Sequence, residues 1–333
     1  RDFVKVLIVD PDGKGRDGHF FSYNEHFVTA VQSLGYSAGV LGRSDLDRTY
    51  LNVKGECVHR ALSVRSWWLA LYDNEENIVR FQQEVDSAIV EYADHEALLL
   101  YCYVGSFGML CALKDLLSKY ENLYVFVNLL WESLPDGLAW ERWYGVIEWL
   151  SSAPARVNIS VPTRELQEQI YDRFGLVPVV SPHPCTSVSD KEALGVLRAS
   201  DGQRCDDKFS VLFPGSQAPG KNFENALSCC AIVADFEGTE VYIRIRDRSK
   251  LSPDILDNVE NLSRKGVKIV DGDLSPGDYE DLFAMAHCVV IPYGARSFRW
   301  RTSGILIDAL VRSRPCVAVE GTWMARVITE FDL

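Results

Sequence analysis

The stretch CVVIPYGARSFRWRTSGILIDAL, residues 288–310, decides the fold class of this chain. It begins with the apolar run Cys288–Pro292, which is typical of a strand buried on both faces of a parallel sheet. A loop with three arginines follows, and then an apolar segment that starts with Ser303 and Gly304. Serine is a favoured helix N-cap, and glycine lets an anion approach the first backbone N–H groups of a helix. The stretch therefore predicts a strand, a cationic loop and a helix start that suits an anion.

The same alternation of strand-like and helix-like segments runs through the whole chain, in two series. A less regular stretch with Pro182 and Pro184 separates the series. We therefore predict an α/β protein with two doubly wound, Rossmann-like domains that face each other across a cleft. The predicted domains cover residues 1–184 and 208–333, with a linker at 185–207.

Apolar periodicity gives the bounds of the predicted elements. The predicted strands are Val4–Val9, Ala38–Leu41, Ala97–Tyr103, Leu123–Leu129, Val157–Val161, Ser210–Phe213, Glu240–Ile245, Val267–Val270, Cys288–Pro292 and Pro315–Val319. The predicted helices are Tyr23–Leu34, Leu138–Leu150, Thr163–Phe174, Asn222–Ala234, Pro253–Lys265, Asp278–Met285 and Ser303–Val311.

Composition limits the function classes. The 333 residues include 34 Lys plus Arg against 47 Asp plus Glu, a net charge of −13, which argues against nucleic acid and against more than peripheral association with membranes. The nine cysteines are odd in number and show no C-x-x-C spacing, so we expect a reducing, cytoplasmic location. We expect no secretory leader at Arg1, and the ends are compatible with trimmed termini and missing C-terminal helices.

A second candidate anion site lies where the alternation restarts. The strand at residues 210–213 ends in Pro214 and Gly215, and a loop then delivers Lys221 to a helix start, where its ammonium and the helix could share one phosphate. The alternative for Lys221 is an exposed, solvated loop lysine. Farther along, Arg244 and Arg246 lie two apart on a predicted strand and could point together.

These motifs resemble the donor domain of nucleotide-sugar glycosyltransferases with the GT-B fold, most similar to the large retaining family 4. The resemblance spans nearly the whole chain and is stronger in the second half. The matching pieces are Pro214, Gly215, Lys221, Asn222, Asp273–Ser275, Asp278, Tyr279, Ile291–Tyr293, Ser303, Gly304, Asp308–Leu310, Arg314–Val319 and Gly321–Thr322, with weaker matches at Gly18, His19, Val161–Thr163, His183 and Pro184.

The resemblance implies a nucleoside diphosphate sugar of UDP or GDP type as donor, and a glycan, lipid-linked or small-molecule acceptor. It implies that the diphosphate is held by Gly215, Lys221, Arg244, Arg299, Arg301, Ser303 and Gly304. It places Asp308, Asp273 and Leu274 at the ribose or base, and Gly18 and Tyr293 at the transferred sugar. His19 and Glu132 are the candidate catalytic residues.

The chain departs from the family pattern at two places. Family members commonly carry a glutamate on the sugar, eight residues before the position of Asp308, where this chain offers Trp300 or Arg301. An arginine commonly found soon after the Pro-Gly strand end is replaced here by Gln217 or Ala218. Arg244, Arg299 or Arg301 could substitute for it.

No metal or other cofactor is expected. Lysine, arginine and helix N–H donors can stabilise the charge of a leaving diphosphate without a metal ion. The pair Asp271 and Asp273 resembles a metal-binding Asp-x-Asp element in form only, because paired Asp around glycine is more often a turn.

Other functions stay open at this point. The segment Gly13–Gly18 matches the dinucleotide fingerprint G-x-G-x-x-G, which would suit an NAD-dependent enzyme, but Asp10–Asp12 intervenes between strand and glycines. A non-catalytic GT-B binding module and a nucleotide-sugar epimerase are further alternatives. Tryptophans in residues 50–72 and 131–149 could stack on an acceptor sugar or simply pack the core.

Overall fold

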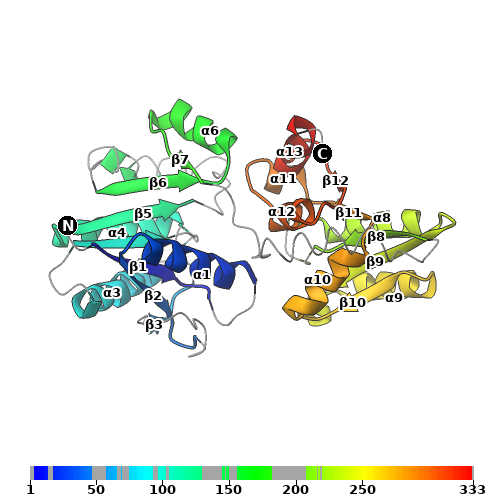
Figure 1. Ribbon diagram of the computed structural model, residues 1–333, viewed down its shortest axis with the longest axis horizontal. Coiled ribbons are helices and arrows are strands. Elements are labelled where there is room, and N and C mark those ends of the chain that lie inside the picture. Colours follow the sequence, from blue (N-terminus) through cyan, green and yellow to red (C-terminus); the bar gives the residue numbers. More distant parts are fainter. Residues whose placement is uncertain are drawn as a thin grey trace. The chain divides into compact units, whose positions relative to one another are not determined.

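The computed structural model describes residues 4–13, 18–46, 58–65, 69, 75–92, 97–102, 105–129, 145–146, 148–149, 156–181, 208–215, 217 and 220–331. The chain divides into two compact units, Arg1–Thr186 and Ser187–Leu333 (Figure 1). The predicted linker at 185–207 lies outside the described residues, and so does most of the predicted Trp-rich helix at 138–150.

The N-terminal unit contains a parallel sheet with the strand order β3-β2-β1-β4-β5-β6-β7 (Figure 1). Its strands are β1 (Val4–Asp10), β2 (Ser37–Arg43), β3 (Val58–Leu62), β4 (Ala97–Cys102), β5 (Leu123–Asn128), β6 (Val157–Val161) and β7 (Val179–Val180). Its described helices are α1 (Gly18–Ser33), α3 (Glu75–Tyr92), α4 (Phe107–Lys119) and α6 (Arg164–Phe174).

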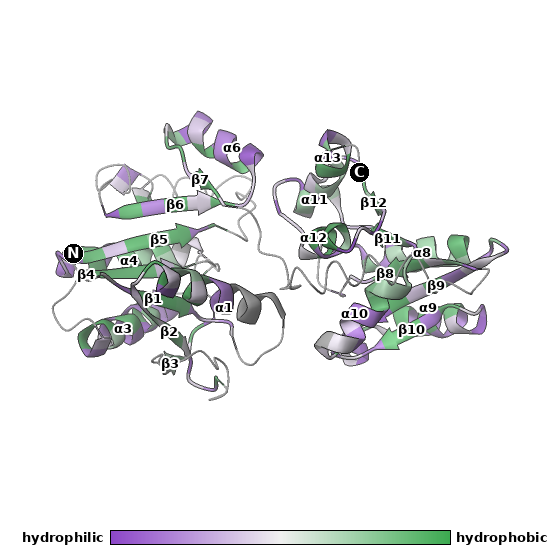
Figure 2. Cartoon of the chain, in the orientation of Figure 1, coloured by the Kyte–Doolittle hydropathy of each residue, from purple (hydrophilic) through white to green (hydrophobic). Residues whose placement is uncertain are grey.

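Helices cover both faces of this sheet, as the apolar strands predict. In β1, Leu7 and Val9 belong to the large core formed with α3, α4 and α6, while Val6 and Ile8 point to the opposite face. On that second face, Phe27 of α1 stacks on Tyr101 of β4, with ring centroids 3.8 Å apart. Figure 2 shows the resulting hydrophobic colouring of β4 and β5.

The C-terminal unit contains a second parallel sheet, with the strand order β10-β9-β8-β11-β12. Its strands are β8 (Phe209–Phe213), β9 (Thr239–Ile245), β10 (Lys268–Asp271), β11 (Cys288–Ile291) and β12 (Cys316–Ala318). Its α-helices are α8 (Phe223–Ala234), α9 (Pro253–Arg264), α10 (Pro276–Met285), α11 (Ala295–Phe298), α12 (Gly304–Val311) and α13 (Trp323–Glu330).

The alternation of side chains along β8 divides the core of this unit into two layers. Val211 and Phe213 pack with α8 and α9, whereas Leu212 packs with α10, α12 and α13 on the other face. Helix α12 is hydrophobic along most of its length, because it lies between the sheet and the neighbouring helices (Figure 2).

Most predicted strands and helices are confirmed to within a few residues. The first predicted helix begins five residues earlier than Tyr23, at Gly18. Helices α3 and α4 and strand β3 were not predicted from the sequence. Among the described helices, none is long and apolar enough to cross a bilayer.

Candidate functional site

The candidate site lies where the strand order of the C-terminal unit reverses. From β8 the chain moves outward through β9 and β10, and then crosses back to β11 on the other side of β8. In open α/β sheets, ligands bind beyond the carboxyl ends of the two strands at such a switch point. Gly215 follows β8 and Tyr293 follows β11, so the predicted motifs meet at this place.

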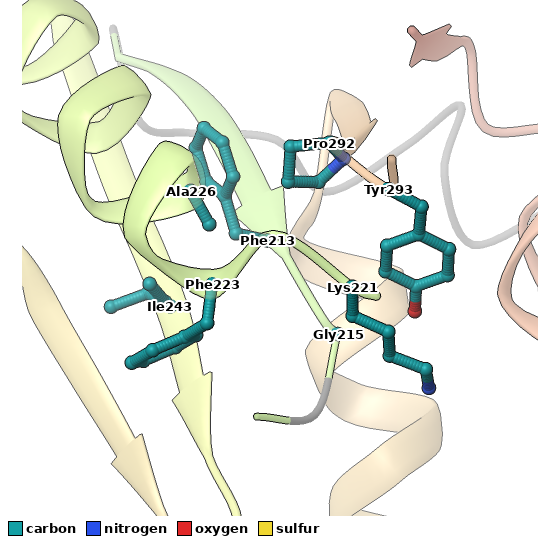
Figure 3. A pocket seen from close by; sticks show the side chains of 8 residues that line it. All are labelled: Phe213, Gly215, Lys221, Phe223, Ala226, Ile243, Pro292 and Tyr293. Atoms are coloured by element: carbon teal, nitrogen blue, oxygen red, sulfur yellow. The ribbon is translucent and has the colours of Figure 1, made fainter. Parts of the chain in front are cut away.

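Lys221 and Tyr293 lie side by side there, with ammonium and hydroxyl pointing the same way (Figure 3). The Lys221 Nζ is 5.0 Å from the centroid of the Tyr293 ring, and both residues line a cavity of about 10 Å³. The backbone at Gly215 lies close to the Tyr293 ring. A side chain at this position would interfere, because a Cβ atom there would lie 3.0 Å from the ring. The cavity has room for about one water molecule.

Several cations gather around Lys221. Burial lowers the pKa of Lys221 to about 8, and Arg301, Arg244 and Arg246 add to this lowering by repulsion. Burial also lowers the pKa of Arg244 and the pKa of Arg301. Burial and repulsion between the cations both disfavour positive charge at this place. A bound anion would offset both effects and stabilise the charged side chains.

Three residues that the sequence assigns to the site carry a buried polar atom without a hydrogen-bond partner among the described residues. These atoms are Arg244 Nε, Tyr293 Oη and Ser303 Oγ. Burial raises the pKa of Tyr293, so its hydroxyl stays protonated and can donate a hydrogen bond. Buried polar groups are nearly always paired in folded proteins, so the unpaired atoms of Arg244 and Tyr293, which interact electrostatically, are suited to a ligand or ordered water.

Helices α8 and α12, which start at the site, differ from the helices that have a side-chain cap. Helices α4, α6, α9, α10 and α13 each begin with a serine or threonine whose hydroxyl accepts a hydrogen bond from the first turn. Helices α8 and α12, which follow Asn222 and Ser303, have no such side-chain cap. Ser303 thus occupies the predicted N-cap position, but the prediction that its side chain caps the helix is wrong. The first N–H groups of both helices are available to an anion.

Gln217 fixes the backbone at the end of β9. Its Nε2 donates to the backbone oxygen of Arg244 and its Oε1 accepts from the backbone N–H of Arg246, both at 3.0 Å. The Arg246 side chain turns outward to an exposed ion pair with Asp273, with Nε 2.5 Å from Oδ1. Leu274 is half-buried and packs against the core. Arg244 and Arg246 lie close enough for their charges to repel each other, and among the described residues only Arg246 has an ion-pair partner, Asp273.

Asp308 lies inside the unit and not at its surface. It is 1% exposed, and Tyr279 donates a hydrogen bond of 2.8 Å to its Oδ2. The guanidinium of Arg312 is 3.6 Å from its Oδ1. Two side chains of the same unit therefore engage this carboxylate, and its assignment to the ribose stays a prediction.

Arg299 does not join the cations around Lys221 either. It is exposed and lies over the ring of Trp300, with its guanidinium carbon 4.7 Å from the ring centroid. Arg326 donates a hydrogen bond to the Arg299 backbone oxygen, at 2.5 Å. Two arginines were predicted to flank the start of α12. Of these two, only Arg301 contributes to the lowered pKa of Lys221.

In the N-terminal unit, the loop after β1 is organised by the carboxylate of Asp10, which is 1% exposed. Its Oδ1 accepts from the backbone N–H groups of Asp12 and Gly13, at 3.1 and 2.7 Å, and its Oδ2 accepts from Asn24. The buried Asp10 carboxylate at the start of this loop would repel a pyrophosphate placed beside it. This arrangement argues against the NAD alternative.

Three further predicted residues, Gly18, His19 and Glu132, lie wholly or partly outside the described part of the chain. Gly18 is the first residue of α1, and His19 follows it in the same helix, but their side-chain surroundings lie outside the described part of the chain. Glu132 lies outside the described residues altogether. Within the described ranges, no group of three or more His, Cys, Asp or Glu side chains could hold a metal ion.

No family model and no curated protein matches the chain. Solved structures do resemble it. Anabaena HepE in complex with UDP is 12% identical with a TM-score of 0.64, over 97% of this chain and 82% of HepE. An E. coli trehalose-6-phosphate structure bound with UDP-2-fluoro glucose is 10% identical with a TM-score of 0.65, over 98% and 86%. WaaG, a glycosyltransferase of lipopolysaccharide biosynthesis, is 13% identical with a TM-score of 0.61, over 99% and 84%.

This likeness shows the fold. The chain has the GT-B architecture of two Rossmann-like domains, as its sequence pattern predicts.

Proposed function

We propose that the protein is a glycosyltransferase that moves a sugar from a nucleoside diphosphate sugar, of UDP or GDP type, to a glycan, lipid-linked or small-molecule acceptor. One observation carries the proposal: two helices without side-chain caps start where Lys221, Arg244 and Arg301 gather. Two phosphates need several donors at one place, and this place offers them in an otherwise acidic chain.

The chemistry of transfer fits these groups. As the bond between the sugar and the diphosphate breaks, negative charge develops on the leaving oxygen. Lys221, Arg244 and Arg301, with the N–H groups at Gly304 and the Tyr293 hydroxyl, would stabilise that charge from fixed positions. We therefore propose transfer without a metal ion. Retention of configuration and the roles of Gly18 and His19 are proposed from the resemblance to family 4. The cytoplasmic location is proposed from the cysteine content, and the role of Glu132 from its position after the strand that begins at Leu123.

The proposal is tested by a thermal-shift screen of nucleoside diphosphates and their sugars, followed by product analysis. A ligand at a hundred times its Kd stabilises the folded state by about 2.7 kcal/mol, so a matching nucleotide should raise the melting temperature clearly. With a stabilising donor, we expect release of UDP or GDP and transfer to an acceptor. Binding without turnover of any donor would indicate a binding module, and a changed free nucleotide sugar would indicate an epimerase.

The affinity for the nucleotide should fall at alkaline pH. The ammonium of Lys221, whose pKa is lowered to about 8, is the form that binds phosphate. Below pH 8 the group is charged and the affinity stays high, whereas above pH 8 each bound nucleotide requires the uptake of a proton. We expect the affinity for UDP or GDP to be about tenfold weaker at pH 9 than at pH 7 by calorimetry.

The control for this pH dependence is Lys221→Arg, because the guanidinium stays charged throughout the range. In that variant the alkaline loss of affinity should disappear. An equal loss in both proteins would assign the pH dependence to another group.

A further inference from the structure

The guanidinium of Arg244 is held by an aromatic ring and not by a carboxylate. Its central carbon lies 5.8 Å from the centroid of the Tyr279 ring. Among the described residues, no Asp or Glu forms an ion pair with Arg244, whereas Arg246 pairs with Asp273 and Arg248 with Asp271. Of these three arginines, Arg244 is thus the one whose charge is not neutralised by an ion pair among the described residues.

The Tyr279 ring is itself fixed from two sides. Its hydroxyl donates to the buried carboxylate of Asp308, and its ring packs against Phe283 with centroids 4.9 Å apart. Asp308 is held in turn by Arg312, which forms a bidentate ion pair with Glu280. A continuous chain of contacts therefore runs from the interior of α10 and α12 to the cation at the end of β9.

We propose that Tyr279 is a positioning residue, which holds the Arg244 guanidinium in place for the diphosphate. An ion pair would also fix an arginine, but it would neutralise the charge that a phosphate needs. A ring face attracts the cation while leaving its N–H donors and full charge for the ligand. This inference rests on the proposed function, because it assigns a role within the same site.

The test compares two substitutions of Tyr279 by calorimetric titration with UDP and with GDP. Tyr279→Leu removes the ring, and we expect it to weaken binding of the nucleotide about fivefold to tenfold. Tyr279→Phe keeps the ring and removes the bond to Asp308, so its loss of affinity should be clearly smaller. Glu280→Gln is the matched control, because Glu280 binds Arg312 and leaves the Tyr279 ring and its bond to Asp308 in place, so the affinity should be unchanged.

Double variants separate positioning from a general loss of structure. In an Arg244→Gln background, Tyr279→Leu should cause no further loss of affinity, because the group it positions is gone. In a Lys221→Met background it should still cause the same fold loss. Equal effects in both backgrounds, or a loss in Glu280→Gln that matches its drop in melting temperature, would overturn the inference. If the unchanged protein binds neither UDP nor GDP, the proposed function fails first and this role with it.

Discussion

Lys221→Met is expected to weaken binding of UDP or GDP by roughly tenfold to a hundredfold, and at the same time to raise the melting temperature of the ligand-free protein. A charged hydrogen bond to phosphate contributes about 1.5–3 kcal/mol, which sets the loss of affinity. The gain in stability follows from the low pKa of Lys221, because burial and neighbouring arginines disfavour its charge. Methionine fills about the same space without a charge, so the substitution removes both the cost of burying the ammonium and its repulsion by the arginines.

The stability change has a definite dependence on pH. Folding lowers the pKa of Lys221 from its ordinary value of 10.5 to about 8, so the unfolded chain binds more protons between these values. The free energy of unfolding of the unchanged protein should therefore rise with pH between about 8 and 10.5, and this rise should be absent in Lys221→Met. Calorimetric titration and thermal melts over this pH range measure both effects.

Lys250→Met is the matched control for Lys221→Met. The Lys250 side chain is exposed and pairs with Asp247 on the surface, at 3.2 Å. Its loss should change the free energy of unfolding by less than about 1 kcal/mol and leave nucleotide affinity unaffected. A fall in melting temperature for Lys221→Met, or unchanged nucleotide binding, would contradict the role given to Lys221.

Arg312→Ala is expected to lower the free energy of unfolding of the C-terminal unit by about 3–5 kcal/mol. The Arg312 side chain is 1% exposed, and it contacts the carboxylates of Glu280 and Asp308 and the backbone oxygen of Asp308. Without the guanidinium, the buried Asp308 carboxylate would lose its ion pair and keep the hydrogen bond from Tyr279. Denaturant unfolding followed by circular dichroism measures the loss.

A surface ion pair provides the comparison for Arg312→Ala. Arg264 and Glu260 lie 3.5 Å apart on α9 with both side chains exposed. Arg264→Ala should cost no more than about 0.5 kcal/mol. If Arg312→Ala and Arg264→Ala lower the free energy of unfolding equally, the buried contacts between α10 and α12 do not stabilise the unit by the expected amount.

The strands and helix starts of the site could be predicted because they depend on local sequence. The short apolar run after His287, bounded by Pro292, is typical of a buried strand, and Pro214 and Gly215 indicate where β8 ends. The starts of α8 and α12 could be predicted in the same way, from the sequence that begins at Asn222 and at Ser303. Helices α3 and α4 were missed although the signal was there, since Phe81, Val85 and Ile89 recur at helical spacing and are buried.

The details of the site depend on contacts between distant residues, which periodicity does not contain. Asp308 and Arg312 are four residues apart, so their pairing within one helix could have been suspected. The Tyr279 hydroxyl that joins them comes from another helix, 29 residues away. In the same way, nothing in the sequence around Gln217 indicates that its amide bonds to β9, 27 residues away.

We assign the nucleoside diphosphate to the switch point of the C-terminal sheet. A crystal structure with UDP or GDP tests this assignment most directly. We predict that the two phosphates lie within hydrogen-bonding distance of Lys221, Arg301 and the first N–H groups of α12. A nucleotide bound instead along the loop after β1, at Gly13–Gly18, would contradict this account and restore the dinucleotide interpretation.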